Sequence, residues 1–205
     1  MVYTIENPNK EQLSNIRSYL EKGHLIVYPT DTIYGIGACI NDNNAIKEVY
    51  QTKQRSYNEP LSICVHDVKQ LKQVAIVNEN IEKIIDMLLP GPYTLLLKKK
   101  SGISNILTAK TDIIGIRIPD NKISYELTKN FPITSTSANI SNKPTPNNIP
   151  DIKKQLGDKI STYIDCGITF SQPSTIIDLT QKKPIIKRQN KKDKLLDNIL
   201  KIDLY

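Results

Sequence analysis

The sequence predicts an α/β fold, and three features of its pattern support that class. Short runs of apolar and β-branched residues, typical of buried strands, alternate with segments whose apolar residues recur at helical spacing. Proline and glycine mark the boundaries between these segments. Several of the apolar runs end in polar side chains, as strands do where an α/β sheet binds small molecules.

The expected elements follow in order along the chain. The first helix would be capped and started by Asn7-Pro8 and stopped by Gly23. Strands are expected at 2–6, 24–28, 61–65, 93–97, 113–119, from 133 onward, and at 163–167, 174–179 and 184–188. Further helices are expected at 43–51, 68–74, 80–89, 124–130 and 152–156, with an amphipathic helix in 191–205.

Chain length and hydropathy bound the architecture. The 205 residues suffice for a sizeable core, and we expect one domain over 1–205 with its core at about 6–190. No apolar run approaches membrane-spanning length, and the N-terminus does not resemble a signal peptide. These features favour a soluble, cytoplasmic protein without a membrane partner.

The cysteines argue against a metal site. Cys39, Cys64 and Cys166 lie far apart, each in an apolar, strand-like context. No CxxC pair or Cys/His cluster is present, and an odd number without framework spacing fits a reducing compartment. We expect three buried thiols.

The formal net charge of +7 allows anionic partners such as nucleotides or RNA. The chain is also rich in lysine, asparagine and isoleucine, so the charge can reflect composition alone. Basic charge by itself therefore does not identify a nucleic-acid-binding protein.

The stretch Tyr28–Gly37 is the densest group of polar residues at a predicted strand end. Pro29 should end the strand, and Thr30, Asp31, Thr32 and Tyr34 then place three hydroxyls and a carboxylate close together. The glycines at 35 and 37 allow a sharp turn or a close approach to a ligand. The stretch is therefore either part of a binding site or a polar hairpin turn.

Three other segments carry candidate ligand groups. Lys53 and Arg55 could clamp a phosphate, although their polar loop could equally be solvated. Arg117 interrupts an apolar strand and suits a carboxylate if it faces a pocket, or is an ordinary edge residue if it faces outward. The hydroxyl and amide side chains of 134–146 could bind phosphate, sugar or amino acid, or form a surface loop.

Together these segments resemble the YrdC family, whose full-length members are L-threonylcarbamoyladenylate synthases. The resemblance covers about residues 20–190, and its combined motifs are far more specific than any one of them. The matching segments are YPTDTIYGIG (28–37), KQR (53–55) followed by PL (60–61), LPGPYTLLL (89–97), IRIPD (116–120), TSANISNKPTP (136–146) and STIIDL (174–179).

The resemblance implies a fold and a reaction. The fold would be a twisted, mixed, open sheet with helices on its faces and a basic concave surface. In the reaction, the amine of L-threonine combines with bicarbonate to give a carbamate, whose oxygen attacks the α-phosphorus of ATP, carried with Mg²⁺, and pyrophosphate leaves. A tRNA threonylcarbamoyltransferase complex then moves the threonylcarbamoyl group to the adenosine beside the anticodon. A labile carbamate needs enclosure more than a covalent nucleophile.

The resemblance also implies roles for individual residues. Lys53 and Arg55 would be catalytic and would contact the phosphates. L-Threonine would be surrounded by Thr32, His66, Arg117, Ser137 and Ser174, with Arg117 on its carboxylate. The nucleotide would be surrounded by Lys53, Arg55, Glu59, Asn139, Ser141, Asn147 and Arg188. No dedicated metal site is implied.

The chain departs from the family pattern at several of these positions. Ser56 follows Arg55 where proline is usual, and Glu59 stands where asparagine commonly precedes Pro-Leu. A carboxylate at 59 would repel phosphate unless it binds ribose, the adenine amine or Mg²⁺. His66 lies one residue further from Pro60-Leu61 than in many relatives. Ser141-Asn142 replaces Ser-Gly, and Asn147 replaces a frequent threonine.

Three alternatives remain open at this point. A double-stranded RNA or tRNA-binding protein of the same superfamily would show a steep salt dependence and no need for ATP, although aromatic residues do not interleave with the basic ones. A carbamoyl-adenylate-forming domain, as in hydrogenase-maturation proteins, would normally accompany zinc-finger and acylphosphatase-like segments. A paralogue with weak or different activity would fit the changes at Ser56 and Glu59.

Overall fold

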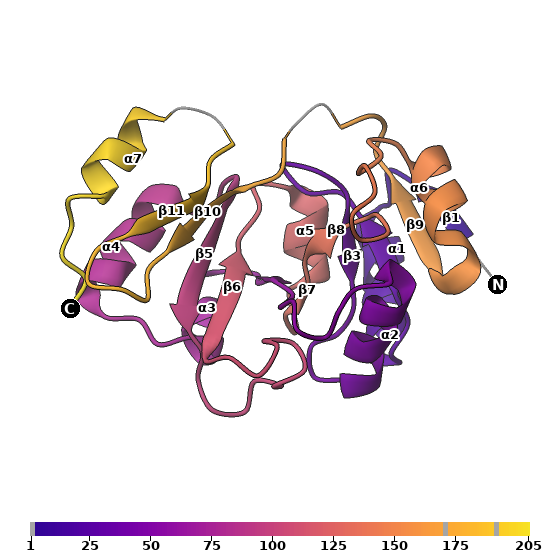
Figure 1. The fold of residues 1–205 in the computed structure, drawn as a ribbon. Coiled ribbons are helices and arrows are strands. Elements are labelled where there is room, and N and C mark those ends of the chain that lie inside the picture. Colours follow the sequence, from indigo (N-terminus) through magenta and orange to yellow (C-terminus); the bar gives the residue numbers. More distant parts are fainter. Residues whose placement is uncertain (1–2, 170–171, 191–192) are drawn as a thin grey trace.

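The computed structural model describes residues 3–169, 172–190 and 193–205 (Figure 1). The helices in these ranges are α1 (Lys10–Glu21), α2 (Asn43–Lys53), α3 (Val68–Val74), α4 (Glu79–Leu88), α5 (Lys122–Leu127), α6 (Ile149–Leu156) and α7 (Lys194–Ile199), with a 3₁₀ turn at Gly157–Lys159. The strands are β1 (Tyr3–Glu6), β2 (Ile26–Tyr28), β3 (Gly35–Gly37), β4 (Ile63–Cys64), β5 (Tyr93–Lys98), β6 (Ile113–Arg117), β7 (Ile133–Thr134), β8 (Thr136–Ser137), β9 (Thr162–Asp165), β10 (Thr175–Asp178) and β11 (Ile185–Arg188).

The strands form two mixed sheets. A five-stranded sheet has the order β1-β9-β2-β3-β8, and a six-stranded sheet has the order β11-β10-β5-β6-β4-β7. Both contain parallel pairs, such as β1 with β9 and β5 with β10, and antiparallel pairs, such as β2 with β3 and β5 with β6. The expected α/β class with a mixed, open arrangement is confirmed, and the strands are divided between two sheets.

One short segment, 133–137, joins the two sheets. Its first part, β7, pairs with β4 of the six-stranded sheet, and its second part, β8, pairs with β3 of the five-stranded sheet. Ser135 lies between them and donates its backbone N–H to Ser62 at 2.7 Å. The sheets therefore meet at the hydroxyl-rich stretch for which the sequence left a ligand-binding segment and a surface loop as alternatives.

Side chains that cap the helices explain most helix starts. Asn9 and Gln12 form a reciprocal capping box, so α1 begins at Lys10 and not directly after Asn7 as predicted. The helices α2, α4 and α6 are capped by Asp42, Asn78 and Asn148, whose side-chain oxygens accept backbone N–H groups of the first turn. The predicted first strand is described from Tyr3, because Val2 lies outside the described residues.

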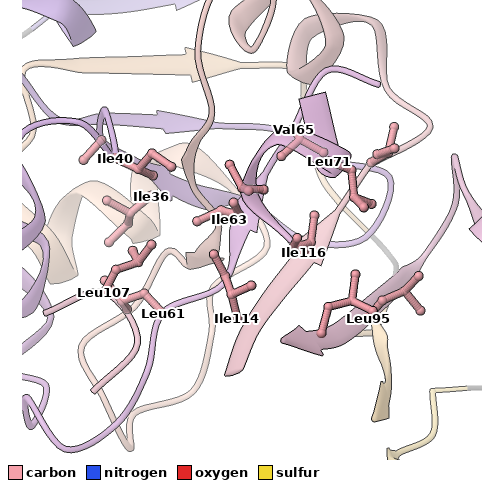
Figure 2. Packing of buried hydrophobic residues seen from close by; sticks show 14 of the residues in the cluster. Ile36, Ile40, Leu61, Ile63, Val65, Leu71, Leu95, Leu107, Ile114 and Ile116 are labelled. Carbon is pink, nitrogen blue, oxygen red and sulfur yellow. The ribbon is translucent and has the colours of Figure 1, made fainter. Parts of the chain in front are cut away.

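A shared apolar core holds the sheets and helices together. Figure 2 shows Ile36 of β3, Ile63 of β4 and Ile116 of β6 among the packed side chains, and each is fully buried. Burial of such a side chain stabilises the fold by about 1.5–3 kcal/mol. Within the described ranges, no helix is long and apolar enough to cross a membrane.

Two expectations need correction. Cys39 and Cys64 are buried, but Cys166 is exposed because it follows the end of β9. The terminal helix spans only Lys194–Ile199, with Leu196 and Ile199 buried, and the part of the prediction at 191–192 lies outside the described residues.

The glycines of β3 make room for an aromatic ring. Both lie in a strand, so the sharp turn, one of the two alternatives that the sequence left open for them, is not observed. A Cβ atom at Gly37 would lie 3.0 Å from Ile26 Cγ1 and 3.1 Å from Tyr28 Cε1, whereas one at Gly35 would meet Tyr28 Cε1 at 3.4 Å. Both distances at Gly37 are shorter than ordinary van der Waals contact, whereas the distance at Gly35 is an ordinary contact.

We predict that Gly37→Ala lowers the free energy of unfolding by about 1–3 kcal/mol, because the fully buried Tyr28 ring must move aside. Gly35→Ala is the matched control in the same strand and should cost less than about 1 kcal/mol. Urea denaturation of both variants measures the difference. An equal loss of unfolding free energy in the two variants would show that crowding at Gly37 does not cause the destabilisation.

Candidate functional site

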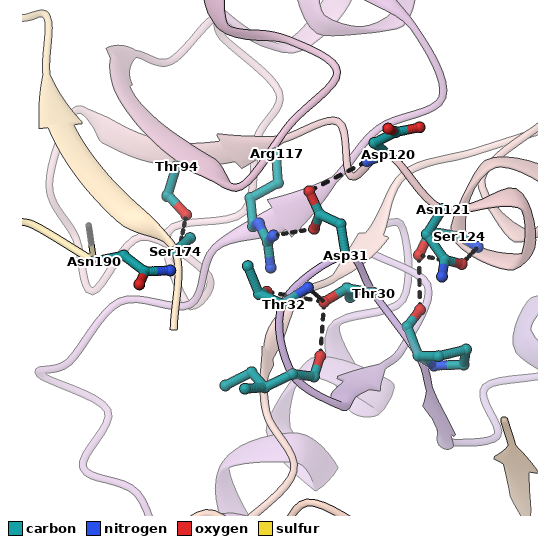
Figure 3. Close-up of polar contacts among 12 residues, drawn as sticks. Thr30, Asp31, Thr32, Thr94, Arg117, Asp120, Asn121, Ser124, Ser174 and Asn190 are labelled. Carbon is teal, nitrogen blue, oxygen red and sulfur yellow. Dashed lines mark hydrogen bonds and ion pairs between the residues drawn. The ribbon is translucent and has the colours of Figure 1, made fainter. Parts of the chain in front are cut away.

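The loop after β2 belongs to both a hairpin and a cavity. Strands β2 and β3 pair antiparallel, so residues 29–34 are a hairpin connection. Thr30 Oγ1 accepts the backbone N–H of Thr32 at 3.1 Å and donates to the Ile33 carbonyl at 2.7 Å (Figure 3). Thr30, Ile33 and Tyr34 also line a cavity, so the stretch is a hairpin connection that forms part of a cavity wall.

The cavity has a volume of about 490 Å³ and lies where the two sheets meet. The five-stranded sheet contributes the hairpin loop, Gly35, Thr136 and Ser137, and the six-stranded sheet contributes residues of β5, β6, β10 and β11. A cavity of this size suits a small ligand with a few fixed polar contacts.

The charge of the cavity wall is entirely positive. Four cationic side chains line the cavity, namely Arg55, Arg117, Lys187 and Arg188. No carboxylate lies among the lining residues that the structure describes; the remaining polar groups there are mainly hydroxyls. Three of these cations are ion-paired with acids that do not line the cavity, namely Asp31, Glu59 and Asp178. A lining whose charged groups are all cationic favours an anionic ligand.

Arg117 faces this cavity, which resolves the alternative that its sequence context left open. Its Nη2 atom donates to Asp31 Oδ1 at 2.6 Å, and both side chains are less than a tenth exposed (Figure 3). Its Nε atom is buried and has no hydrogen-bond partner among the described residues. Burial raises the pKa of Asp31, while the Arg117 charge opposes that rise.

A second cation lies close to Arg117 at the end of β11. Arg188 donates from Nε and Nη2 to the Ser174 carbonyl at 3.0 and 2.8 Å. The Ser174 hydroxyl in turn lies 2.7 Å from that of Thr94 (Figure 3). Burial, followed by the nearby Arg117 charge, lowers the pKa of Arg188. The two arginines thus line one cavity from two non-adjacent strands of the six-stranded sheet.

Lys53 supports the cavity wall from inside the protein. Its side chain is almost fully buried, and its Nζ atom donates to the Ser137 carbonyl, to the Asn139 carbonyl at 2.8 Å and to Asn139 Oδ1 at 3.1 Å. The same Asn139 oxygen accepts the Ser137 hydroxyl at 2.6 Å. In this structure Lys53 therefore contacts the wall that presents Ser137, and it is not itself a lining residue.

Arg55 reaches the cavity while held by Glu59. Its Nη1 lies 3.2 Å from Glu59 Oε2, and its Nε and Nη2 donate to the carbonyls of Glu59 and Pro60. The Glu59 side chain is half exposed. The unusual acid at position 59 is thus paired with the cation expected to contact phosphate.

The structure brings part of the predicted set together. Five of the residues line the cavity, namely Arg55, Arg117, Ser137, Ser174 and Arg188. Four more contact the wall without lining the cavity. The Thr32 hydroxyl is hydrogen-bonded to the hydroxyl of the lining residue Thr30, and the other three are Lys53, Asn139 and Glu59, whose contacts are described above. Ser141 donates its backbone N–H to the Lys53 carbonyl at 2.8 Å, and its buried hydroxyl has no partner within the described ranges.

Two predicted residues lie elsewhere. His66 lines a separate hollow of about 1090 Å³, where its ring stacks on Tyr125 at 3.9 Å between centroids and its Nδ1 lies 2.9 Å from the Tyr125 carbonyl. The carbonyl of Asn147 accepts the Thr169 backbone N–H at 2.9 Å, and its side chain contacts Asn148. The structure does not place either side chain at the cavity.

Sequence reasoning missed several lining residues. Thr94 is a lone hydroxyl in an apolar strand, and Lys187 directly precedes the expected Arg188. The signal for Thr94 was its position in YTLLL, where a buried hydroxyl needs a partner. Ser62 is a lone hydroxyl in an apolar run, whereas Thr30 and Ser135 lie in hydroxyl-rich stretches, where sequence does not show which side chain faces inward.

The arrangement can hold an anion without a protein-bound metal. Hydroxyls and guanidinium groups can bind carboxylate and phosphate, and the walls can exclude water from a labile adduct. Over the ranges that are described, no group of three or more His, Cys, Asp or Glu residues is arranged to hold a metal ion.

The chain is similar to several known proteins. A putative threonylcarbamoyl-AMP synthase of Methanocaldococcus jannaschii is 43% identical over 186 residues, covering 88% of each chain. The structure of Pyrococcus abyssi Sua5 complexed with L-threonine has a TM-score of 0.86 and 31% identity, covering 92% of this chain and 57% of that one. The crystal structure of Escherichia coli YciO also has a TM-score of 0.86, with 27% identity and coverage of 94% and 98%.

The chain therefore spans little more than half of the Pyrococcus protein but nearly all of YciO. A family profile for Sua5/YciO/YrdC proteins, described as "Telomere recombination", matches residues 18–190. With most of its length matched and a relative above 40% identity, this chain belongs to the Sua5/YciO/YrdC family.

Proposed function

We propose that this protein is an L-threonylcarbamoyladenylate synthase, a nucleotidyltransferase that forms threonylcarbamoyl-AMP and pyrophosphate from L-threonine, bicarbonate and ATP. The observation that carries the proposal is the cavity with four cations and no facing carboxylate among its described lining residues. Each of the three substrates presents an anionic group, since L-threonine has a carboxylate, bicarbonate is itself an anion and ATP carries a triphosphate.

Arg117 is the residue best placed for the threonine carboxylate. It is buried, faces the cavity and retains an unpartnered Nε atom within the described structure. A guanidinium binds a carboxylate through two parallel N–H groups, which fixes the orientation of the ligand. The hydroxyls of Ser137 and Ser174 line the same cavity and can contact the rest of the amino acid.

Arg55 and Arg188 are the cations proposed to contact the nucleotide. Charge develops on the phosphate oxygens as the carbamate oxygen attacks and pyrophosphate leaves, and fixed cations stabilise that charge. Lys53 would act through the wall formed by Ser137 and Asn139, to which its Nζ atom is bound. This arrangement supports catalysis by enclosure and orientation, without a covalent enzyme intermediate.

Mg²⁺ enters the proposal as part of the ATP substrate. Magnesium prefers oxygen ligands and usually keeps several waters when it is bound with substrate phosphates. The described lining residues offer it no carboxylate, so the phosphates and water would supply its ligands.

The product requires a second enzyme. A mixed anhydride of a carbamate and a phosphate hydrolyses readily, so we propose that a tRNA threonylcarbamoyltransferase complex takes it up in the cytoplasm and modifies the adenosine beside the anticodon. Direct RNA binding by this chain is the alternative that the net charge of +7 allows.

The proposal predicts pyrophosphate release that requires each substrate. Release from ATP and Mg²⁺ should occur with L-threonine and bicarbonate together and fall to background when either is omitted. A coupled pyrophosphate assay measures this directly. Release that needs neither compound, or no release together with salt-sensitive RNA binding, would contradict the synthase and favour the alternatives.

Glu59 should compete with phosphate for Arg55. Because the acid is half exposed, its ion pair is worth at most about 1 kcal/mol, so Glu59→Gln should lower the KM for ATP by about two- to fivefold. The KM for L-threonine should be unchanged, which serves as the internal control. A raised KM for ATP would instead show that Glu59 binds the nucleotide.

Burial, together with the nearby Arg55 charge, lowers the pKa of Lys53 from 10.5 to about 7. Between these pH values the unfolded chain binds the lysine proton and the folded chain does not. The free energy of unfolding should therefore rise with pH by about 1.4 kcal/mol per unit between pH 8 and 9.5, relative to Lys53→Met. Urea denaturation across this range measures both slopes, and parallel slopes would contradict the lowered pKa.

A further inference from the structure

We propose that Asp31 is a positioning residue for substrate recognition, because it holds the Arg117 guanidinium so that its free edge faces the cavity. This inference rests on the proposed function, since it assigns the threonine carboxylate to Arg117.

The ion pair connects two parts of the site that belong to different sheets. Asp31 lies in the hairpin loop of the five-stranded sheet, and Arg117 ends β6 in the six-stranded sheet. Their contact at 2.6 Å occurs between side chains that are 9% and 7% exposed. A charge pair so well shielded from water is strongly coupled in orientation, because either charge alone would be costly to bury.

Asp31 is itself fixed at its second oxygen. Its Oδ2 accepts the backbone N–H of Asp120 at 3.3 Å, just beyond the strand that carries Arg117. The backbone two residues before Asp31 is held as well, because the Ser124 hydroxyl donates to the Pro29 carbonyl at 2.8 Å (Figure 3). The carboxylate is therefore a rigid support and not a mobile competitor for the guanidinium.

Asp31 leaves most of Arg117 available. The hydrogen bond uses one of the five N–H groups of a guanidinium. Nε has no partner among the described residues, although Arg117 as a whole is only 5% exposed. Asp31 is not a lining residue, whereas Arg117 is. A carboxylate ligand would thus approach Arg117 from the cavity while Asp31 holds it from behind.

The chemistry of the ligand follows from this geometry. A planar guanidinium fixed on one side presents a fork that matches a carboxylate and discriminates against an uncharged amide. Asp31 should therefore affect the amino-acid substrate and leave the nucleotide unaffected. Its effect should appear in KM for L-threonine and not merely in the amount of active protein.

The test uses Asp31→Asn in the full-length chain, with steady-state pyrophosphate release measured against L-threonine and ATP separately. We expect the KM for L-threonine to rise by about tenfold or more, because an orienting charged hydrogen bond is lost. The KM for ATP should change by less than about twofold, as expected for a residue that acts only on the threonine subsite. A threonine KM that is unchanged or lower would overturn the positioning role.

Two further variants keep the test decisive. Asp31→Glu retains the charge but is one methylene longer, so it should preserve folding and still raise the KM for L-threonine. If Asp31→Asn does not fold, an unchanged KM for L-threonine in Asp31→Glu overturns the proposal. Glu126→Gln removes the acid that lies 3.7 Å from Arg17, away from the cavity lining, and should change neither KM. If wild-type protein does not use threonine at all, the proposed function fails first, which separates the two conclusions.

Discussion

The ion pair between Asp31 and Arg117 is the interaction on which the rest of the site depends. It links the hairpin loop of one sheet to a strand end of the other, and it does so away from water. The segment 133–137 provides a second connection through the backbone, because its two strands pair with different sheets. Together they define the cavity in which an anionic amino acid and a nucleotide could react without exposing the carbamate to solvent.

Much of the fold could be predicted from local pattern. The runs around Ile63 and Ile116 are almost entirely apolar, and this composition predicts that they are buried. Asp42 and Asn78 are residue types that favour helix starts, because their side chains accept the free backbone N–H groups of the first turn. The division into two sheets could not be predicted in this way. It depends on the pairing of β7 and β8 with strands far away in sequence, and periodicity does not report such pairing.

The site residues could be predicted where a sequence motif identifies them, and less well where packing decides which way their side chains point. Arg117, Ser137 and Ser174 line the cavity as expected from their motifs. Lys53 was expected to contact phosphate, but its Nζ atom is bound to three oxygens of the wall and does not line the cavity. His66 stacks on Tyr125 and does not face the cavity. No pattern in the sequence indicates this stacking or the inward turn of Lys53.

The central claim is that Arg117 receives the carboxylate of the amino-acid substrate, and the Nε–Hε group of Arg117 reports on it most directly. Its ¹⁵N NMR signal, assigned through Arg117→Lys, should shift and become protected from exchange when L-threonine is added. L-Threoninamide, which lacks the carboxylate, should leave the signal unchanged. An identical response to both compounds, or no response to L-threonine, would contradict the account.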